Sequence, residues 1–136
     1  MKVLVDTPIW SLALRKKGID SSNNSIIKNL INLIEGGRIA IIGSIRQELL
    51  SGISDKNKYY EIKNKMGIFS DYDIQTNDYE FAAECSNECR RNGIQGSHTD
   101  FLICAVAIKN GWEIFTEDAD FIEYRKYLPI NIYEIK

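Results

Sequence analysis

Short apolar runs alternate with longer amphipathic segments along this chain. Continuous apolar runs of a few residues are typical of strands that are buried on both faces. Such runs predict strands at 2–6, 38–42, 113–116 and 130–135. Between them, apolar residues at helical spacing predict helices that begin after Asp6 and at Ser44, span 26–35, 55–66 and 76–92, and begin again near 98 and after 121. Strands that alternate with helices predict a three-layer α/β/α sandwich with a mainly parallel central sheet.

Residues with known capping preferences mark the helices that follow the first two predicted strands. Thr7 and Pro8 are a favourable N-cap and first-turn pair, so a helix is expected directly after Asp6. Ser44 and Gln47 have the spacing of a capping box at the start of SIRQELLSG. Both helices are therefore expected to begin close to the carboxyl end of a strand.

The composition fits one globular domain, residues 1–136, with 44% apolar and 26% charged residues. The N-terminal MKVLVDTP lacks the apolar segment of a signal peptide, so we expect a cytoplasmic protein that does not enter a membrane. We accordingly expect the three cysteines to be reduced and to serve as small hydrophobic residues. A formal net charge of −2 argues against binding of nucleic acid by bulk electrostatics alone. It leaves open a nucleic-acid enzyme whose acidic residues surround metal ions.

Three aspartates stand directly after predicted strands. Asp6 ends the first strand, and Asp118 and Asp120 follow the strand at 113–116. In an open parallel sheet, ligands bind at the edge formed by the carboxyl ends of the strands. These aspartates are therefore candidates for chemistry at that edge.

Two further carboxylates are predicted to lie on apolar helix faces. Glu48 falls on the side of its helix that carries Ile45 and Leu49. Asp100 stands at the entrance to the unbroken apolar octet 101–108. A charge in such surroundings is costly unless another group compensates it.

Each of these acids also has an ordinary structural explanation. The acids that follow strands stand where helix N-caps are expected, Asp100 with Ser97 fits a capping box, and Glu48 can extend to solvent. The joint pattern is harder to explain in this way, because four separate segments direct carboxylates toward one edge without lysine or arginine on the same faces. Mg²⁺ and Mn²⁺ prefer such oxygen ligands, so the pattern predicts a divalent-metal site.

Three segments of the chain match a known family in order and spacing. They are VLVDTPIWS at 3–11, RQELLSG at 46–52 and HTDFLICAVAIKNGWEIFTEDADF at 98–121. With these segments the sequence resembles the PIN-domain ribonucleases, and in particular the VapC-type toxins of bacterial toxin–antitoxin pairs. The resemblance covers nearly the whole chain.

The resemblance implies a PIN-like fold with a metal site formed by Asp6, Glu48, Asp100 and Asp118. Many relatives have T-x-N-x-x-D-F where this chain has TEDADF, which leaves open whether Asp118 or Asp120 is the last ligand. Asp118 is nearer the strand end and is favoured, with Asp120 as an additional or alternative ligand. Thr116 is a further candidate that would supply a hydroxyl group to the site.

The same resemblance implies an endoribonuclease toxin that uses Mg²⁺ or Mn²⁺. A cation would lower the pKa of a bound water, which then hydrolyses an RNA phosphodiester to leave a 5′-phosphate and a 3′-hydroxyl. The implied partners are the RNA substrate, a cognate antitoxin whose tail covers the acidic site, and a second copy of the chain in a homodimer. Whether one or two metals act, and which RNA is cut, stays open.

Basic side chains are candidates for contact with RNA or with the antitoxin. Arg46, close to Glu48 in sequence, is the first of them. The segment 15–17, and Lys56 and Lys63 with their neighbouring tyrosines, are further candidates, although such residues more often form a solvated rim.

Two other classes of protein were weighed against the nuclease. Phosphotransferases of the haloacid-dehalogenase type also begin with VLVD but require D-x-D-x-T, whereas Asp6 is followed by Thr7, Pro8 and Ile9. A non-catalytic PIN-like module that binds RNA or protein is the remaining alternative. Binding alone has no use for converging carboxylates, and a module without a metal site should show no Mn²⁺-dependent change in thermal stability.

Overall fold

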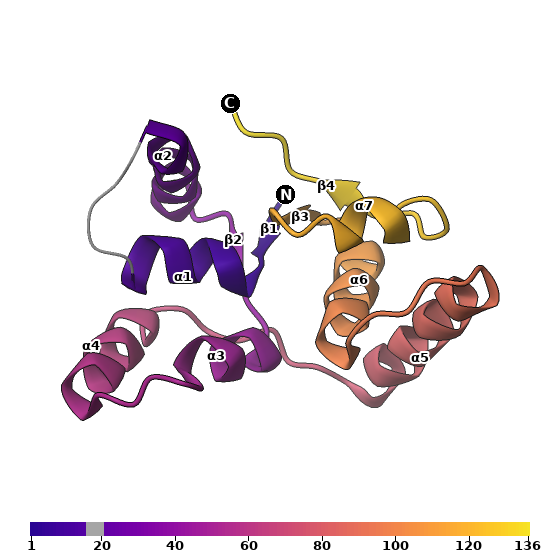
Figure 1. Cartoon of the computed structure of the whole chain (residues 1–136), viewed down its shortest axis with the longest axis horizontal. Coiled ribbons are helices and arrows are strands. Elements are labelled where there is room, and N and C mark those ends of the chain that lie inside the picture. The colour runs from indigo at the N-terminus through magenta and orange to yellow at the C-terminus, as the bar shows by residue number, and fades with distance from the viewer. Residues whose placement is uncertain (16–20) are drawn as a thin grey trace.

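The computed structural model describes residues 1–15 and 21–136 (Figure 1). Lys16 and Lys17 of the predicted basic segment lie outside the described residues. The described part forms four strands and seven helices in mixed order, as the sequence pattern predicts.

The four strands form one parallel sheet in the order β2-β1-β3-β4. They are β1 (Val3–Val5), β2 (Ile39–Ala40), β3 (Glu113–Phe115) and β4 (Asn131–Ile132). Each strand is shorter than its apolar run, because only these residues pair with a neighbouring strand: Val3, for example, lies opposite both Ile39 and Glu113. The predicted parallel sheet is confirmed.

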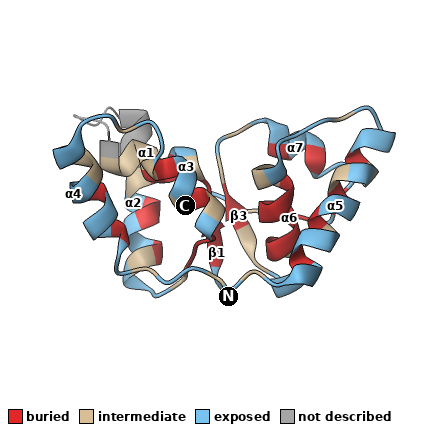
Figure 2. Ribbon diagram, turned by 90° about the horizontal axis from the view of Figure 1, so that it is seen from below, coloured by how far each residue is buried: buried red, intermediate tan, exposed pale blue. Residues whose placement is uncertain are grey.

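Helices cover both faces of the sheet and produce the predicted three layers (Figures 1 and 2). One layer contains α1 to α4 and the other contains α5 to α7. The bounds are α1 Thr7–Arg15, α2 Ser21–Glu35, α3 Gly43–Leu50, α4 Lys56–Met66, α5 Thr76–Arg91, α6 His98–Asn110 and α7 Asp120–Tyr124.

Two predicted helix starts are wrong in detail. The Asp6 carbonyl accepts hydrogen bonds from the N–H groups of Ile9 and Trp10, so Asp6 and not Thr7 precedes the first turn of α1. Helix α3 begins at Gly43 without a side-chain cap, so Ser44 lies inside the first turn and forms no capping box. The first difference matters for the site, because it leaves the Thr7 hydroxyl free for another partner.

The core lies between the sheet and its two helical layers. All three residues of β1 are fully buried, and seven consecutive residues of α6, from Phe101 to Ala107, are also buried (Figure 2). The three cysteines are free and buried, which confirms their expected role as small hydrophobic residues. Among residues 1–15 and 21–136, no helix combines the length and apolar character needed to cross a bilayer.

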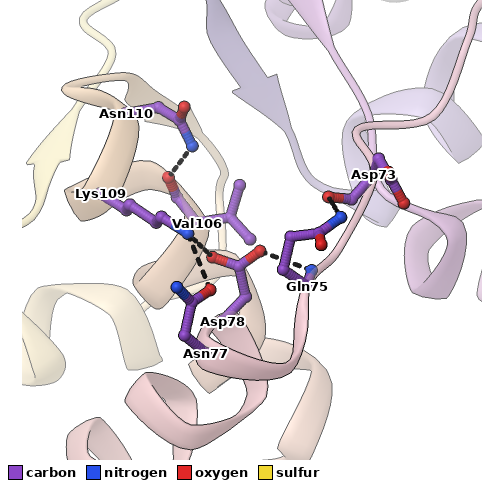
Figure 3. Close-up of polar contacts among 7 residues, drawn as sticks. All are labelled: Asp73, Gln75, Asn77, Asp78, Val106, Lys109 and Asn110. Carbon is purple, nitrogen blue, oxygen red and sulfur yellow. Dashed lines mark hydrogen bonds and ion pairs between the residues drawn. The ribbon is translucent and has the colours of Figure 1, made fainter.

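An ion pair between a buried aspartate and an exposed lysine joins α5 to α6 (Figure 3). The Asp78 side chain is fully buried, and its Oδ1 accepts a hydrogen bond from Lys109 Nζ at 2.9 Å. Its Oδ2 accepts from the backbone N–H of Gln75 at 2.8 Å, which closes a capping box at the start of α5. Lys109 also donates to Asn77 Oδ1 at 2.9 Å. These contacts hold the C-terminal end of α6 against the N-terminal end of α5, and so help to set the position of α6.

Candidate active site

The predicted acidic edge lies where the strand order reverses. From β1 the chain first forms β2 on one side and later forms β3 on the other, which makes the carboxyl ends of β1 and β3 a topological switch point. Asp6 follows β1 and Thr116 follows β3, and the Asp6 N–H donates to the Phe115 carbonyl at 2.9 Å. The register of the two strands therefore places Asp6 and Thr116 side by side.

Asp6 is the most buried carboxylate of this edge, with 5% of its surface exposed. Its Oδ1 accepts from the Thr7 N–H at 2.8 Å, and its Oδ2 accepts from the Thr116 hydroxyl at 2.8 Å. The Thr116 oxygen in turn accepts from the Asp118 N–H at 3.0 Å. Thr116 thus links the Asp6 carboxylate to the loop that carries Asp118.

Three further aspartates converge above this pair. Asp100, Asp118 and Asp120 each present a carboxylate oxygen within 4.8 Å of the other two. Asp118 lies in the loop after β3 and Asp120 is the first residue of α7. Asp118 Oδ1 accepts from the Asp120 N–H at 2.9 Å and so shapes the turn into α7. Asp100 comes from the first turn of α6, whose predicted cap is present: Ser97 Oγ accepts from the Asp100 N–H at 3.0 Å.

Tyr124 is a site neighbour that sequence reasoning missed. Its hydroxyl donates to Asp100 Oδ2 at 2.6 Å, and its side chain is fully buried. Burial and the nearby Asp100 carboxylate raise the pKa of Tyr124 above its usual range, so the hydroxyl keeps the proton that it donates. No local signal distinguishes this tyrosine from a core residue, because the contact depends on how α7 packs against α6.

The prediction that Glu48 lies within the apolar face of its helix is wrong. Ile45 and Leu49 are fully buried, but Glu48 is exposed, because a helical step of 100° turns it from Leu49 toward the rim. Its Oε1 accepts from the Thr7 hydroxyl at 3.1 Å. Glu48 thus reaches the neighbourhood of Asp6 through Thr7, outside the group of three aspartates.

Among the described side chains, no lysine or arginine pairs with these carboxylates. None of the ion pairs between described side chains includes Asp6, Glu48 or the three clustered aspartates. Burial raises the pKa of Asp6 to about 6, against hydrogen bonds from Thr116 and Thr7, and repulsion from Asp100 and Asp118 adds to the increase. Burial also raises the pKa of Asp100, against hydrogen bonds from Tyr124 and Ser97. Burial thus disfavours the ionised form of both carboxylates, and no described side chain offsets this cost with a positive charge.

The donor set fits a hard divalent cation. Opposite ligands of one Mg²⁺ ion, each about 2.1 Å from the metal, are about 4.2 Å apart. The oxygens of Asp100, Asp118 and Asp120 lie within 4.8 Å of one another before any ion draws them together. An all-oxygen, all-anionic set of this kind suits Mg²⁺ or Mn²⁺ better than softer metals.

Asp6→Asn is expected to stabilise the metal-free protein near pH 7. The folded state raises the pKa of Asp6 from 3.8 to about 6, so folding takes up a proton when the pH lies between these two values. At higher pH, the ionised Asp6 carboxylate lowers the free energy of unfolding. Removing the charge should add about 1–3 kcal/mol to the free energy of unfolding near pH 7 and almost nothing below about pH 4. Urea denaturation in EDTA at the two pH values measures the difference. A difference independent of pH would show that the charge of Asp6 is not the cause.

Arg46 is held within the chain. Its guanidinium donates to Asp71 Oδ1 at 2.9 and 3.0 Å and to the carbonyl oxygens of Met66 at 2.9 Å and Phe69 at 2.7 Å. It thereby ties α3 to the end of α4 and the segment that follows. A contact of Arg46 with RNA or with an antitoxin stays a prediction.

This fold and site define a class of α/β proteins in which acidic residues gather at the switch point of a parallel sheet. The PIN domain family model matches residues 3–127, and the chain belongs to this family.

Two ribonucleases are similar to this chain in sequence. VapC ribonuclease Mb1587 of Mycobacterium bovis and ribonuclease VapC11 of Mycobacterium tuberculosis are each 31% identical to it over 121 residues, which is 88% of this chain and 88% of each relative.

Solved structures share the fold. One is VapBC2 from Rickettsia felis, bound to a DNA fragment from its own promoter. It matches with a TM-score of 0.75 and 21% identity over 100% of both chains. FitAcB from Neisseria gonorrhoeae matches with a TM-score of 0.72 and 16% identity, over 97% of this chain and 96% of that one.

Proposed function

We propose that this chain is a Mg²⁺- or Mn²⁺-dependent endoribonuclease, the toxin of a toxin–antitoxin pair. The observation that carries the proposal is the convergence of Asp100, Asp118 and Asp120 beside the buried Asp6, at the switch point of a PIN domain. The 31% identity to VapC ribonucleases, over most of both chains, supports the same conclusion.

The chain's own residues divide the work of such a site. Asp100 and Asp118 would hold the cation with Asp6, and Asp120 would be an additional or alternative ligand. When bound, the cation lowers the pKa of a water and neutralises charge on the phosphate. Thr116 orients Asp6 through its 2.8 Å hydrogen bond. Glu48 is exposed at the rim, and we propose that its carboxylate orients a water molecule or joins the ligands of the cation.

The surface beside the acids is suited to an RNA strand. A groove of about 450 Å³ is lined by Thr7, Ser44, Gln47, Glu48, Ser51 and Thr99. A second hollow of about 410 Å³ shares Ser44 and Thr99 with it and extends toward His98 and Arg90. Hydroxyl and amide groups of this kind hydrogen-bond phosphates and sugars without reading sequence. We infer that single-stranded or loop RNA lies there, since its backbone can enter an open groove.

The proposal includes partners. VapBC2 and FitAcB share the fold of this chain. From the resemblance to VapC-type toxins we infer that a cognate antitoxin binds this chain and covers its acidic site. We also propose that the active form is a homodimer and that it acts in the cytoplasm, where its RNA substrate lies. An antitoxin side chain with positive charge would pair with the clustered carboxylates, which form no ion pair with the described side chains of this chain.

The test is RNA cleavage by the purified chain, freed of any co-purified protein. Total cellular RNA is incubated with Mg²⁺ or Mn²⁺, with EDTA in a parallel reaction. We expect discrete fragments in the presence of metal and intact RNA with EDTA, and mapping of the fragment ends would identify the target. Cleavage that persists in EDTA would refute the metal-dependent mechanism. No cleavage together with no Mn²⁺-dependent change in melting temperature would favour a non-catalytic binding module.

A further inference from the structure

The hydroxyl of Tyr124 makes a short hydrogen bond to one of the clustered carboxylates. The 2.6 Å distance to Asp100 Oδ2 lies in the range of charge-assisted O–H···O⁻ bonds. Asp100 is the member of the group that comes from α6, whereas Asp118 lies in the loop before α7 and Asp120 is the first residue of α7. Tyr124 is the last residue of α7, so its hydrogen bond connects the two segments that form the group.

Two phenylalanine rings pack against the ring of Tyr124. Its centroid lies 5.0 Å from that of Phe101 on α6 and 5.2 Å from that of Phe121 on α7. Both of these phenylalanines are buried. A rigid aromatic donor loses little conformational freedom when it binds a carboxylate, so the packed ring makes the hydroxyl an effective anchor.

Gly96 provides the space that the hydroxyl occupies. A Cβ atom added to Gly96 would overlap the Tyr124 hydroxyl and the ring carbon that carries it. Gly96 is not among the glycines with positive φ, so its backbone conformation does not require glycine. The requirement is steric, and any side chain at this position would displace the Tyr124 hydroxyl from Asp100.

We propose that Tyr124 is a positioning residue of the metal site: its hydroxyl, accommodated by Gly96, holds the Asp100 carboxylate toward Asp118 and Asp120 so that the three can share a cation. Repulsion among three carboxylates would otherwise favour rotation of Asp100 away from the group. The proposal rests on the proposed function only in requiring that a divalent cation binds there. Hydrogen bonds that orient metal ligands typically contribute 10- to 100-fold in metal affinity.

The test is Mn²⁺ binding, measured by isothermal titration calorimetry on the full-length wild type and on Tyr124→Phe. Phenylalanine keeps the ring packing and removes only the donor. The matched control is Tyr133→Phe, because Tyr133 is also buried but its hydroxyl donates to Asn29 Oδ1, at 2.8 Å. We expect Tyr124→Phe to bind Mn²⁺ at least about tenfold more weakly than wild type. Tyr133→Phe should bind Mn²⁺ as the wild type does, whatever its melting temperature.

A second variant, Gly96→Ala, displaces the hydroxyl while every hydrogen-bond donor is kept, and it should also weaken Mn²⁺ binding. It decides the question if Tyr124→Phe does not fold. If the wild type binds Mn²⁺ and the folded variants bind it with the same affinity, the positioning role of Tyr124 is overturned, whereas the proposed metal dependence stands. Equal weakening in Tyr133→Phe would also overturn it, by showing a general effect of lost buried hydroxyls. A wild type that takes up no Mn²⁺ would overturn both this inference and the metal dependence proposed above.

Discussion

The Asp100→Asn variant is expected to lose RNA cleavage by about a hundredfold or more while it stays folded. A metal ion contributes several kcal/mol of transition-state stabilisation, and the variant removes one of the three carboxylates that lie within 4.8 Å of one another. Asparagine keeps an oxygen that can accept from the Tyr124 hydroxyl. The bond to Ser97 Oγ is donated by the backbone N–H of residue 100, which the substitution does not change. The fold should therefore survive the change.

The expected stability effect has the opposite sign to the activity effect. Because burial raises the pKa of Asp100, its ionised form lowers the stability of the metal-free protein above the ordinary pKa of an aspartate. Asp100→Asn should accordingly melt at the same temperature as wild type or higher in EDTA, and it should gain less from added Mn²⁺. Asp73→Asn, at an exposed aspartate outside the site, is the control for loss of one charge. A cleavage rate within a few-fold of the wild-type rate would show that Asp100 is not a residue of the active site.

Asp78→Ala is expected to cause the largest loss of stability, about 3 kcal/mol. The substitution removes a fully buried side chain that closes the capping box of α5 and pairs with Lys109. It leaves the Gln75 N–H without its acceptor, and an unsatisfied donor together with a lost cap accounts for an effect of this size. Urea denaturation near neutral pH measures it. Glu88→Ala, which breaks an exposed ion pair with Arg91 on the same helix, should have little effect.

The pH dependence of this loss of stability tests whether the ionised Asp78 carboxylate is its cause. Burial raises the pKa of Asp78, but the hydrogen bond from Gln75 and the contact with Lys109 outweigh burial and hold the pKa below its usual range. A lowered pKa means that the ionised group stabilises the fold above its ordinary value of 3.8 and that this contribution is lost as the pH falls further. The difference between wild type and Asp78→Ala should therefore narrow in acid. A constant difference would assign the effect to packing alone.

Much of the fold could be read from local pattern. The apolar runs before Asp6 and Thr116 predicted two buried strands, and parallel pairing of those strands was enough to place Asp6 beside the loop that carries Asp118. Ser97 was correctly expected at the start of α6, because an N-cap depends on groups only three residues apart. Strand ends were less well predicted, because they depend on the length of the neighbouring strand.

The residues of the candidate site could be predicted, but not all of their contacts. Glu48 was assigned to an apolar face on helical periodicity, but the packing of α3 places it at the rim, where its partner is Thr7. That partner was itself missed, because Thr7 was expected to cap the helix with its own hydroxyl. A shift of one residue in a helix start changes which side chains are free to make other contacts.

By itself, the sequence determined the succession of strands and helices along the chain, the parallel pairing of the strands and the carboxylates that follow them. These depend on the periodicity of nearby residues and on the rule that ligands bind at the carboxyl ends of parallel strands. Only the tertiary structure decided that Asp120 joins Asp100 and Asp118 while Glu48 contacts Thr7, and that Tyr124 and Gly96 support Asp100. Such contacts join segments that are distant along the chain. They depend on how α6 and α7 pack against each other, which local sequence patterns do not predict.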